Sequence, residues 1–470
     1  MSSLASDAPS VAVVGGGLAG LAAGCALAGA GFHVTLLERR PYLGGRASSY
    51  EHPGTGEVVD NCQHVLLGCC TNLVDFYRRI GVEEKIRWFD RLVFVEPGGR
   101  QSVITPSWLP APFHSAPAFL RAASLSLADK LAIARAMLAI TTRLPEETEE
   151  NFLSWLRRHG QTGRAIERFW KVVLVSALNE DLDRMSVHYA AQVFRESFLK
   201  SPEAGRMGVP TVPLTELYSA GADYIRARGG EALLRAPVES FHPEAGGIRV
   251  CSAAREVKAD FAVLAVPFDA LARLLPEGQE TQPLRQQLSR FETSPITGIH
   301  LWFDRQITQL EHAVLLDRTI QWMFHKSKLL CRKASGAEQE NGSYVELVVS
   351  SSKSLVERPK NEIEEMALKE LREFFPGAAE ARLLKSTVIK EVHATYSALP
   401  RSDDYRPGTG TAWPNVFLAG DWTASGWPAT MDGAVRSGYG AAEALARSAR
   451  RESRFLQPDL AGTGFMRLFD

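Results

Sequence analysis

The N-terminal part of the chain alternates between short apolar runs and a helical stretch. Residues 11–14 are apolar without interruption, which is typical of a strand buried in a parallel sheet. After three glycines, an Ala- and Leu-rich segment predicts a helix from Leu18 to Ala30. A second apolar run, 33–37, ends at the acidic residue Glu38. Strand, turn, helix and strand in this order predict a βαβ unit with parallel strands.

The rest of the chain predicts a long helical region followed by alternating strands and helices. Between about 105 and about 205 the apolar spacing is helical, most clearly at 127–140 and 151–158. The remaining predicted elements are two short strands within 92–100, a helix that follows Pro213 and ends at Arg228, strands at 236–241, 260–267, 298–303, 342–349 and 383–391, a charged helix at 360–375, and a C-terminal strand and helix at 415–422 and 430–445. We expect an α/β fold in which a Rossmann-like domain is interleaved with a domain of mixed sheet and helices.

The glycines after the first strand predict a nucleotide-binding turn. Gly15, Gly17 and Gly20 match the pattern G-x-G-x-x-G, which allows a tight turn, a close diphosphate and close helix packing. The first N–H groups of the following helix, from Leu18 and Ala19, would then face the diphosphate. The alternative is a plain βαβ unit in which the glycines serve only packing.

Two features after the second strand indicate which dinucleotide is bound. Glu38 lies 23 residues after Gly15, where a dinucleotide site places the carboxylate that accepts ribose hydroxyls. Directly after it come Arg39 and a Gly-Gly-Arg turn, in which Gly45 brings the chain close and Arg46 can fork onto phosphate oxygens. An NAD site has no general need for this second turn. The alternative is a solvated basic loop.

A third glycine-rich segment lies near the C-terminus. A predicted strand ends at Gly420 and Asp421, and a helix rich in Ala and Gly begins near Thr430 and Met431. An Asp at a strand end can hold a ribityl hydroxyl, and a helix N-terminus can stabilise the negative charge of a reduced flavin. Three separated segments directed at one long ligand predict FAD as the cofactor.

Composition and charge limit the function classes. The 470 residues are long enough for two domains with sizeable cores. Lys plus Arg is 53 and Asp plus Glu is 54, so no net charge attracts nucleic acid. No run of about eighteen apolar residues predicts a transmembrane helix, and residues 1–9 show no secretory signal. We expect a cytoplasmic protein.

The cysteines favour neither disulfides nor a metal site. Six cysteines in a chain of this size do not make a disulfide framework. Cys62, His64, Cys69 and Cys70 lie close together, but their spacing fits no zinc pattern. We therefore expect buried thiols and no metal.

The motifs together resemble the FAD-dependent amine oxidase and phytoene desaturase superfamily over nearly the whole chain. Segments 60–73 (DNCQHVLLGCCTNL), 420–423 (GDWT) and 427–434 (WPATMDGA) resemble its squalene-associated branch, the hydroxysqualene dehydroxylases of hopanoid synthesis. The resemblance implies an FAD-binding domain of the glutathione reductase and amine oxidase type, in which the strand holding Val238 lies against the adenine. The implied boundaries are 1–91, 206–270 and 409–450 for the FAD-binding domain, 92–205 and 271–408 for the substrate domain, and 451–470 for a tail.

The resemblance also implies the reaction, which is reductive removal of a hydroxyl from hydroxysqualene to give squalene. Loss of water leaves an allylic cation, which hydride from reduced FAD can quench while aromatic side chains exclude water. His64 can supply the proton and Asp60 can tune it, whereas the alternative for His64 is a structural residue bonded to backbone. Trp422, Trp427 and Tyr439 line the flavin or fill the core.

Two other functions stay open at this point. One is an FAD-dependent desaturase or oxidase of an isoprenoid or an amine, and the other is a prenyl-binding protein without activity. A polyisoprenoid substrate must be collected from a membrane. The apolar stripe of 127–140, the apolar tail 455–470 and the basic residues Arg121, Lys130 and Arg135 predict peripheral contact with the inner face of the cell membrane. The alternative for this stripe is an ordinary core helix, and the electron donor of the flavin is not identified.

Overall fold

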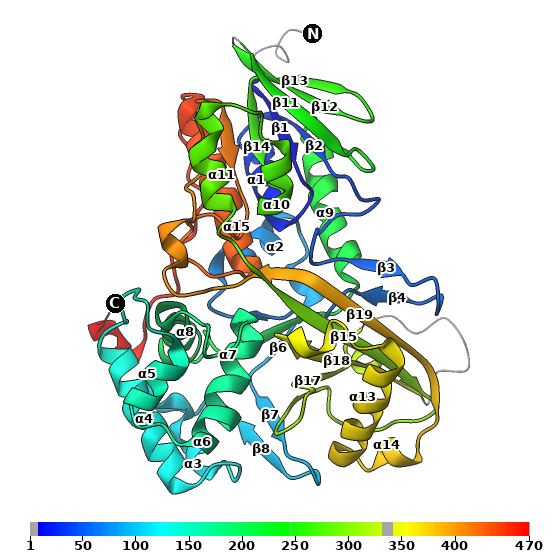
Figure 1. Ribbon diagram of the computed structural model, residues 1–470, viewed down its shortest axis with the longest axis vertical. Coiled ribbons are helices and arrows are strands. Elements are labelled where there is room, and N and C mark those ends of the chain that lie inside the picture. Colours follow the sequence, from blue (N-terminus) through cyan, green and yellow to red (C-terminus); the bar gives the residue numbers. More distant parts are fainter. Residues whose placement is uncertain (1–7, 245, 331–341, 470) are drawn as a thin grey trace.

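The computed structural model describes residues 8–244, 246–330 and 342–469, and it confirms the predicted α/β fold (Figure 1). The N-terminal residues 1–7, which belong to the segment without a predicted secretory signal, lie outside the described residues. One half of the molecule holds a parallel sheet, and the other holds a mostly antiparallel sheet beside a group of helices.

The parallel sheet has five strands in the order β10–β2–β1–β14–β20, and every neighbouring pair is parallel. Its strands are β1 (Ser10–Val14), β2 (His33–Leu37), β10 (Glu231–Leu233), β14 (Phe261–Leu264) and β20 (Val416–Leu418). Strands from distant parts of the chain therefore build one sheet, and their carboxyl ends share one edge. In open sheets of this kind, ligands bind at that edge.

Helices cover one face of the parallel sheet, and a small sheet together with a short helix covers the other (Figure 1). The first face packs against α1 (Leu18–Gly29), α2 (Thr71–Arg79), α9 (Leu214–Arg226) and α15 (Met431–Ser448). The second packs against α10 (Phe268–Leu274) and the antiparallel strands β11 (Val238–Glu244), β12 (Gly247–Ser252) and β13 (Glu256–Ala259). Burial on both faces explains why the strands read as continuous apolar runs.

The second large sheet has seven strands in the order β19–β15–β18–β17–β16–β7–β8. Its strands are β7 (Leu92–Val95), β8 (Gln101–Ile104), β15 (Thr293–Phe303), β16 (His312–Leu315), β17 (Trp322–His325), β18 (Ser343–Ser350) and β19 (Leu383–Tyr396). Pairing is antiparallel except between β7 and β16. The short helices α12 (Lys326–Leu329) and α14 (Gly377–Glu380), the longer helix α13 (Lys360–Phe374) and, beside the parallel sheet, α11 (Gln282–Leu288) complete this part of the chain.

Two small sheets lie between the halves, and a helical insert completes the fold. The small sheets consist of β3 (Ser49–Glu51) with β4 (Val58–Asp60), and of β5 (Leu66–Leu67), β9 (Met207–Pro210) and β6 (Ile86–Phe89). The insert contains α3 (Ala116–Arg121), α4 (Leu127–Thr142), α5 (Phe152–Arg158), α6 (Gly163–Ala165), α7 (Lys171–Leu178) and α8 (Val187–Phe194).

Helix α4 is buried on one side only. Ile133, Ala136 and Ile140 are at most 2% exposed, whereas Leu127, Leu131 and Leu138 are 63–68% exposed. One face of this helix therefore belongs to the hydrophobic core, as the core-helix alternative predicts, and its other face is open to solvent. Within the described part of the chain, no helix has the length and apolarity needed to span a bilayer.

Candidate functional site

The first glycine turn follows β1 and leaves space for a ligand. Gly15 has φ +109°, and a Cβ atom there would lie 2.5 Å from the carbonyl oxygen of Ala265. A Cβ at Gly20 would lie 1.9 Å from the carbonyl oxygen of Gly15. Gly17 differs, because a Cβ there would meet only the Cα of Gly45 at 3.8 Å. The outer glycines are thus required by packing, while Gly17 borders open space.

The N-terminus of α1 points its amide groups toward this space. No side chain caps the helix at Gly17, and no acidic residue lies in its first turn. The first amides, including those of Leu18 and Ala19, therefore have no partner within the helix. Unpaired amides and the helix dipole together favour an anion such as a diphosphate.

Glu38 lies beside the same turn, at the end of β2. It is 6% exposed, and its carboxylate accepts hydrogen bonds from the backbone N–H groups of Gly16 and Arg40, each at 2.7 Å. These bonds fix the carboxylate and leave lone pairs for ribose hydroxyls. The side chain of Arg39 is exposed. The strand that holds Val238 begins close by, since the N–H of Ala236 donates to the carbonyl of Glu38 at 2.8 Å.

The second glycine turn packs directly on the first. The N–H of Gly44 donates to the carbonyl of Gly16 at 2.9 Å. Gly45 has φ +62°, and a Cβ there would lie 2.9 Å from the Cα of Gly17. Both turns therefore border the same space.

Arg46 joins this turn to the C-terminal segment. Its guanidinium forms an ion pair with the carboxylate of Asp421 at 2.5 Å, although the two residues are 375 positions apart, and it donates to the carbonyl of Ala394 at 3.2 Å. We expected Arg46 to bind phosphate oxygens; the structure brings it together with another residue predicted to bind the cofactor. Gly420, which precedes Asp421, donates its N–H to Ser437 at 2.8 Å.

Helix α15 follows the third predicted cofactor segment, and we call the region bordered by the two glycine turns, Glu38, Asp421 and the start of α15 the cofactor groove. The Thr430 hydroxyl caps it by accepting from the N–H of Gly433 at 3.0 Å, and the sulfur of Met431 accepts from Tyr218 at 3.5 Å. A Cβ at Gly438 would lie 2.3 Å from the carbonyl oxygen of Ala19, so α15 crosses α1 in close contact. Both helices follow strands of the parallel sheet and begin on the side where those strands end.

The segment 60–64 lies between the cofactor groove and the seven-stranded sheet. Asp60 is 4% exposed and bonds to Lys326 at 2.7 Å, to the Ser49 hydroxyl at 2.6 Å and to the N–H of Leu214 at 3.2 Å. Burial acts to raise the pKa of Asp60, but Lys326 and the hydrogen bonds outweigh it and hold the pKa below the ordinary value. The carboxylate is therefore ionised and committed to these partners rather than hydrogen-bonded to His64.

His64 is held through its Nδ1 atom. This atom lies 2.7 Å from the carbonyl oxygen of Cys62, so in the neutral ring it carries the proton and donates it. Burial lowers the pKa of His64, and the nearby carboxylate of Asp60 opposes this effect. Near neutral pH the ring is therefore mainly neutral, and its Nε2 atom acts as an acceptor.

Sequence reasoning missed two buried cations at this site. Lys326 lies at the start of α12, and Arg406 lies in a loop before β20. The Arg406 guanidinium donates to the backbone carbonyls of Asp421 at 3.0 Å and Trp427 at 2.8 Å, and so shapes the loop after β20. Neither residue belongs to a recognisable motif, because each acts through backbone or carboxylate groups distant in the sequence.

The three aromatic residues left open by the sequence are packed within the protein. The indole N–H of Trp422 donates to the carbonyl of Val266 at 3.1 Å, and the Trp427 ring lies 4.0 Å from the Arg436 guanidinium. The Tyr439 hydroxyl donates to Asp75 at 2.8 Å in the core between α2 and α15. Tyr439 therefore fills the core.

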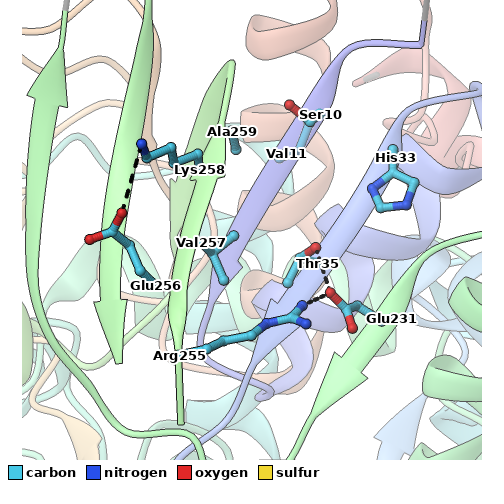
Figure 2. Close-up of a pocket in the computed structure, with 10 residues that line it drawn as sticks. All are labelled: Ser10, Val11, His33, Thr35, Glu231, Arg255, Glu256, Val257, Lys258 and Ala259. Atoms are coloured by element: carbon cyan, nitrogen blue, oxygen red, sulfur yellow. Dashed lines mark hydrogen bonds and ion pairs between the residues drawn. The ribbon is translucent and has the colours of Figure 1, made fainter. Parts of the chain in front are cut away.

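Two surface cavities lie at the opposite edge of the parallel sheet. One, of about 260 Å³, is shown in Figure 2 and is lined by Ser10 and His33, where strands begin, and by Glu231, whose carboxylate is paired with Arg255. The other, of about 770 Å³, lies beside Asp260 and Asn415. Both are separated from the glycine turns by the length of the strands.

Comparisons with known proteins agree with this geometry. The family model described as flavin containing amine oxidoreductase matches residues 18–446. The chain is 28% identical to a 15-cis-phytoene desaturase of Synechococcus elongatus, over 93% of this chain and 95% of the relative. It is 27% identical to a zeta-carotene desaturase of Synechocystis sp., over 95% and 99%.

Solved structures share the fold at lower identity. A cyclohexylamine oxidase from Brevibacterium oxydans superposes with a TM-score of 0.65 at 17% identity, covering 94% of this chain and 100% of the other. An oxidoreductase from Methanosarcina mazei superposes with a TM-score of 0.70 at 18% identity, covering 91% and 98%.

Proposed function

This chain belongs to the flavin-containing amine oxidoreductase family and is an FAD-dependent oxidoreductase, and we propose that its substrate is a long polyisoprenoid. The observation that carries the proposal is the similarity to two carotenoid desaturases over more than nine-tenths of this chain. The exposed apolar face of α4 supports it, because an enzyme that uses such a substrate must reach it in a membrane.

The residues of the groove fit FAD. The space beside Gly17 and the unpaired amides of α1 suit the diphosphate, and the carboxylate of Glu38 suits the adenosine ribose. The Arg46–Asp421 pair joins the second and last cofactor segments, where it can hold the ribityl and phosphate groups. FAD, when bound, supplies hydride exchange with the substrate.

The apolar patch, as we call it, consists of exposed side chains of the helical insert and the tail. Its members are Trp108, Phe113, Leu120, Leu127, Leu131, Leu138, Phe465 and Leu468, which are 53–90% exposed. The tail belongs to it because the N–H of Phe465 donates to the carbonyl of Ala111 at 2.9 Å, and its ring centre lies 6.1 Å from that of Phe113.

We propose that the apolar patch lies in the interface of a bilayer, on the cytoplasmic side of the cell membrane. Transfer of apolar side chains of this size out of water is favourable. The exposed side chains of Arg121 and Arg135 can contact anionic lipid headgroups. Lys130 is partly tied down, because its ammonium donates to the carbonyl of Leu120 at 2.7 Å.

At a finer level, we propose reductive dehydroxylation of hydroxysqualene to squalene. The resemblance of segments 60–73 and 420–434 to hydroxysqualene dehydroxylases supports this reaction. The C–O bond breaks, the hydroxyl leaves as water after taking up a proton, and the carbon accepts a hydride. In this reaction His64 donates from Nε2, since Nδ1 is bonded to Cys62, and it does so in its protonated form, which is the minor form near neutral pH because burial lowers the pKa of the ring.

The names of the curated relatives favour a second candidate, which is desaturation of an isoprenoid. The two reactions run in opposite directions, because desaturation removes hydride from the substrate. Reduced enzyme with hydroxysqualene and oxidised enzyme with phytoene, each incubated without oxygen, distinguish them by mass analysis of the extracted lipid. Squalene in the first mixture supports dehydroxylation, conjugated polyene in the second supports desaturation, and unchanged lipid in both contradicts the polyisoprenoid proposal.

A further inference from the structure

A buried group of charged side chains lies outside the cofactor-binding segments, where segment 60–64 meets the seven-stranded sheet. Lys326 begins α12, directly after β17, and is 2% exposed. Asp60 ends β4 and is 4% exposed, and Glu346 in the middle of β18 is fully buried. One cation therefore faces two carboxylates in the interior.

The ammonium of Lys326 connects the two sides of this contact. It donates to Asp60 at 2.7 Å and to the side-chain oxygen of Gln63 at 2.8 Å, both of which belong to segment 60–64. On the side of the sheet it lies 3.4 Å from Glu346. In the next strand, His300 pairs in register with Glu346, and its Nδ1 atom is bonded to the Tyr344 hydroxyl at 2.9 Å.

Segment 60–64 also touches the second glycine turn. The side-chain amide of Asn61 donates to the carbonyl of Arg46 at 2.8 Å, and the N–H of Asn61 donates to the carbonyl of Ser48 at 2.9 Å. On its other side, a Cβ at Gly298 in β15 would lie 3.2 Å from the carbonyl oxygen of Asn61. The segment is therefore enclosed between the cofactor groove and the sheet.

A buried ammonium is a costly way to fill this position. Replacing a buried ion pair by apolar side chains of similar volume is often neutral or stabilising, so packing alone does not call for a charge here. What an ammonium adds is direction, because its hydrogen bonds select one arrangement of the groups around it. Here those bonds reach two residues of one segment.

We propose that Lys326 is a positioning residue that holds segment 60–64, and with it His64, at a set place between the cofactor groove and the sheet. The claim that Lys326 holds segment 60–64 in place does not depend on which reaction the enzyme catalyses. The expected effect of Lys326 on turnover rests on the proposed function. Without Lys326, Asp60 and Gln63 lose their shared partner, and we expect the remaining bonds of Asp60 and Asn61 to hold the segment less firmly.

The test is hydrogen exchange of the FAD-loaded full chain, followed in peptides by mass spectrometry. In Lys326→Met, we expect amides of residues 60–66 to exchange about tenfold faster or more, with FAD content and the exchange of residues 11–20 unchanged. The matched control is Glu346→Gln, which removes a charge from the same group but leaves both bonds from Lys326 to the segment and keeps a side-chain oxygen beside the backbone N–H of Gln63, which faces Glu346. Its residues 60–66 are expected to exchange within about twofold of the wild-type rate.

Slow exchange of residues 60–66 in Lys326→Met would overturn the proposal, and so would uniformly faster exchange in all peptides, because that reports general destabilisation. If this variant does not fold, Lys326→Met combined with Asp60→Asn removes one of the two carboxylates left without the ammonium, and the same readout decides. Turnover gives a second readout, in which kcat falls at least about tenfold and KM changes little. If the wild-type enzyme turned over no polyisoprenoid, the proposed function would be contradicted. The hydrogen-exchange result would still decide whether Lys326 positions segment 60–64.

Discussion

Two Ala- and Leu-rich helices of this protein, α1 and α4, are used in opposite ways. Every residue of α1 from Leu18 to Ala28 is buried, and its N-terminus carries no side-chain cap. Helix α4 leaves Leu127, Leu131 and Leu138 open to solvent, and its N-terminus is closed by a capping box between Ser126 and Asp129. The first helix presents its end to a ligand, and the second presents its side.

The difference follows from which groups are left unsatisfied. In α1 the side chains are buried by packing, and the backbone amides at its N-terminus remain available to bind an anion. In α4 the capping box satisfies backbone N–H groups at the N-terminus, so the part of the helix that remains available for binding is its exposed apolar face. Similar composition therefore serves cofactor binding in one region and, in our proposal, membrane contact in the other.

The largest expected effect comes from filling the space at the end of α1. Gly17 has φ −75° and ψ 179°, which a valine can adopt, and a Cβ there has no close contact. Gly17→Val should therefore fold and lose FAD affinity by about 1,000-fold or more, or about 4 kcal/mol, by blocking the diphosphate. Calorimetric titration of the apoprotein with FAD measures this.

The matched control is Gly440→Ala in α15, where a Cβ would meet only the Thr409 methyl carbon at 3.9 Å. FAD affinity should stay within about twofold of wild type. Equal loss in both variants would contradict the assignment of the α1 end as the diphosphate site.

The second-largest expected effect concerns a buried carboxylate outside the cofactor region, Glu346, which differs from Glu38 in the cofactor region. Glu38 in the cofactor region accepts two backbone hydrogen bonds, whereas Glu346 shares the single ammonium of Lys326 with Asp60. Burial raises the pKa of Glu346 from 4.5 to about 7, against the opposing effect of Lys326. Asp60 adds to the rise, and Cys62, Tyr344 and His300 also face this group.

Because the folded-state pKa is the higher one, the native protein binds this proton more tightly than the unfolded chain. The associated stability is fully present below pH 4.5 and is lost as the pH rises through about 7. Glu346→Gln should abolish this loss, which is of the order of 3 kcal/mol. Urea unfolding of both proteins at about pH 5 and about pH 8 measures it, and parallel pH dependences would contradict the assignment.

The apolar face of α4 gives the third effect. Replacing Leu127, Leu131 and Leu138 together by serine should weaken binding to anionic vesicles by about 30-fold, or about 2 kcal/mol, while the unfolding midpoint changes little. Vesicle cosedimentation measures the affinity. Leu384→Ser is the control, because Leu384 is 49% exposed but lies on β19, outside the apolar patch. Unchanged binding of the triple variant would remove the proposed membrane contact.

The smallest effect concerns the closed end of α4. The Ser126 hydroxyl donates to Asp129 at 2.7 Å and accepts from its N–H at 3.3 Å. Ser126→Ala should cost about 1 kcal/mol of unfolding free energy and leave FAD affinity unchanged. Denaturant unfolding combined with FAD titration checks both parts, and a fall in FAD affinity would show that the two helix ends are not independent.

The cofactor region was the more predictable from sequence. Gly15, Gly17, Gly20 and Glu38 stand close together in the chain, so their spacing directly reports a local turn. The βαβ unit and the FAD site follow from such spacing. The ion pair between Arg46 and Asp421 brings the second and the last of the three predicted cofactor segments together, although the form of this contact depends on tertiary structure.

The substrate region was less predictable because its key contacts are long-range. Lys326 reaches Asp60 across 266 positions, and Arg406 acts on backbone carbonyls that have no sequence signal. Apolar spacing located α4, but which of its faces is exposed depends on neighbouring elements. The strand predicted at 383–391 continues to Tyr396 because β15 pairs with it beyond a bulge.

The central claim is hydride exchange between the bound flavin and a polyisoprenoid, and flavin absorbance tests it most directly. Holoenzyme reduced without oxygen is mixed with vesicles that carry hydroxysqualene, and the absorbance is followed while the lipid is extracted. Our account predicts that the oxidised spectrum returns and that squalene forms in equal amount. An unchanged reduced spectrum with hydroxysqualene, together with an oxidised enzyme that amines reduce and phytoene does not, would contradict it.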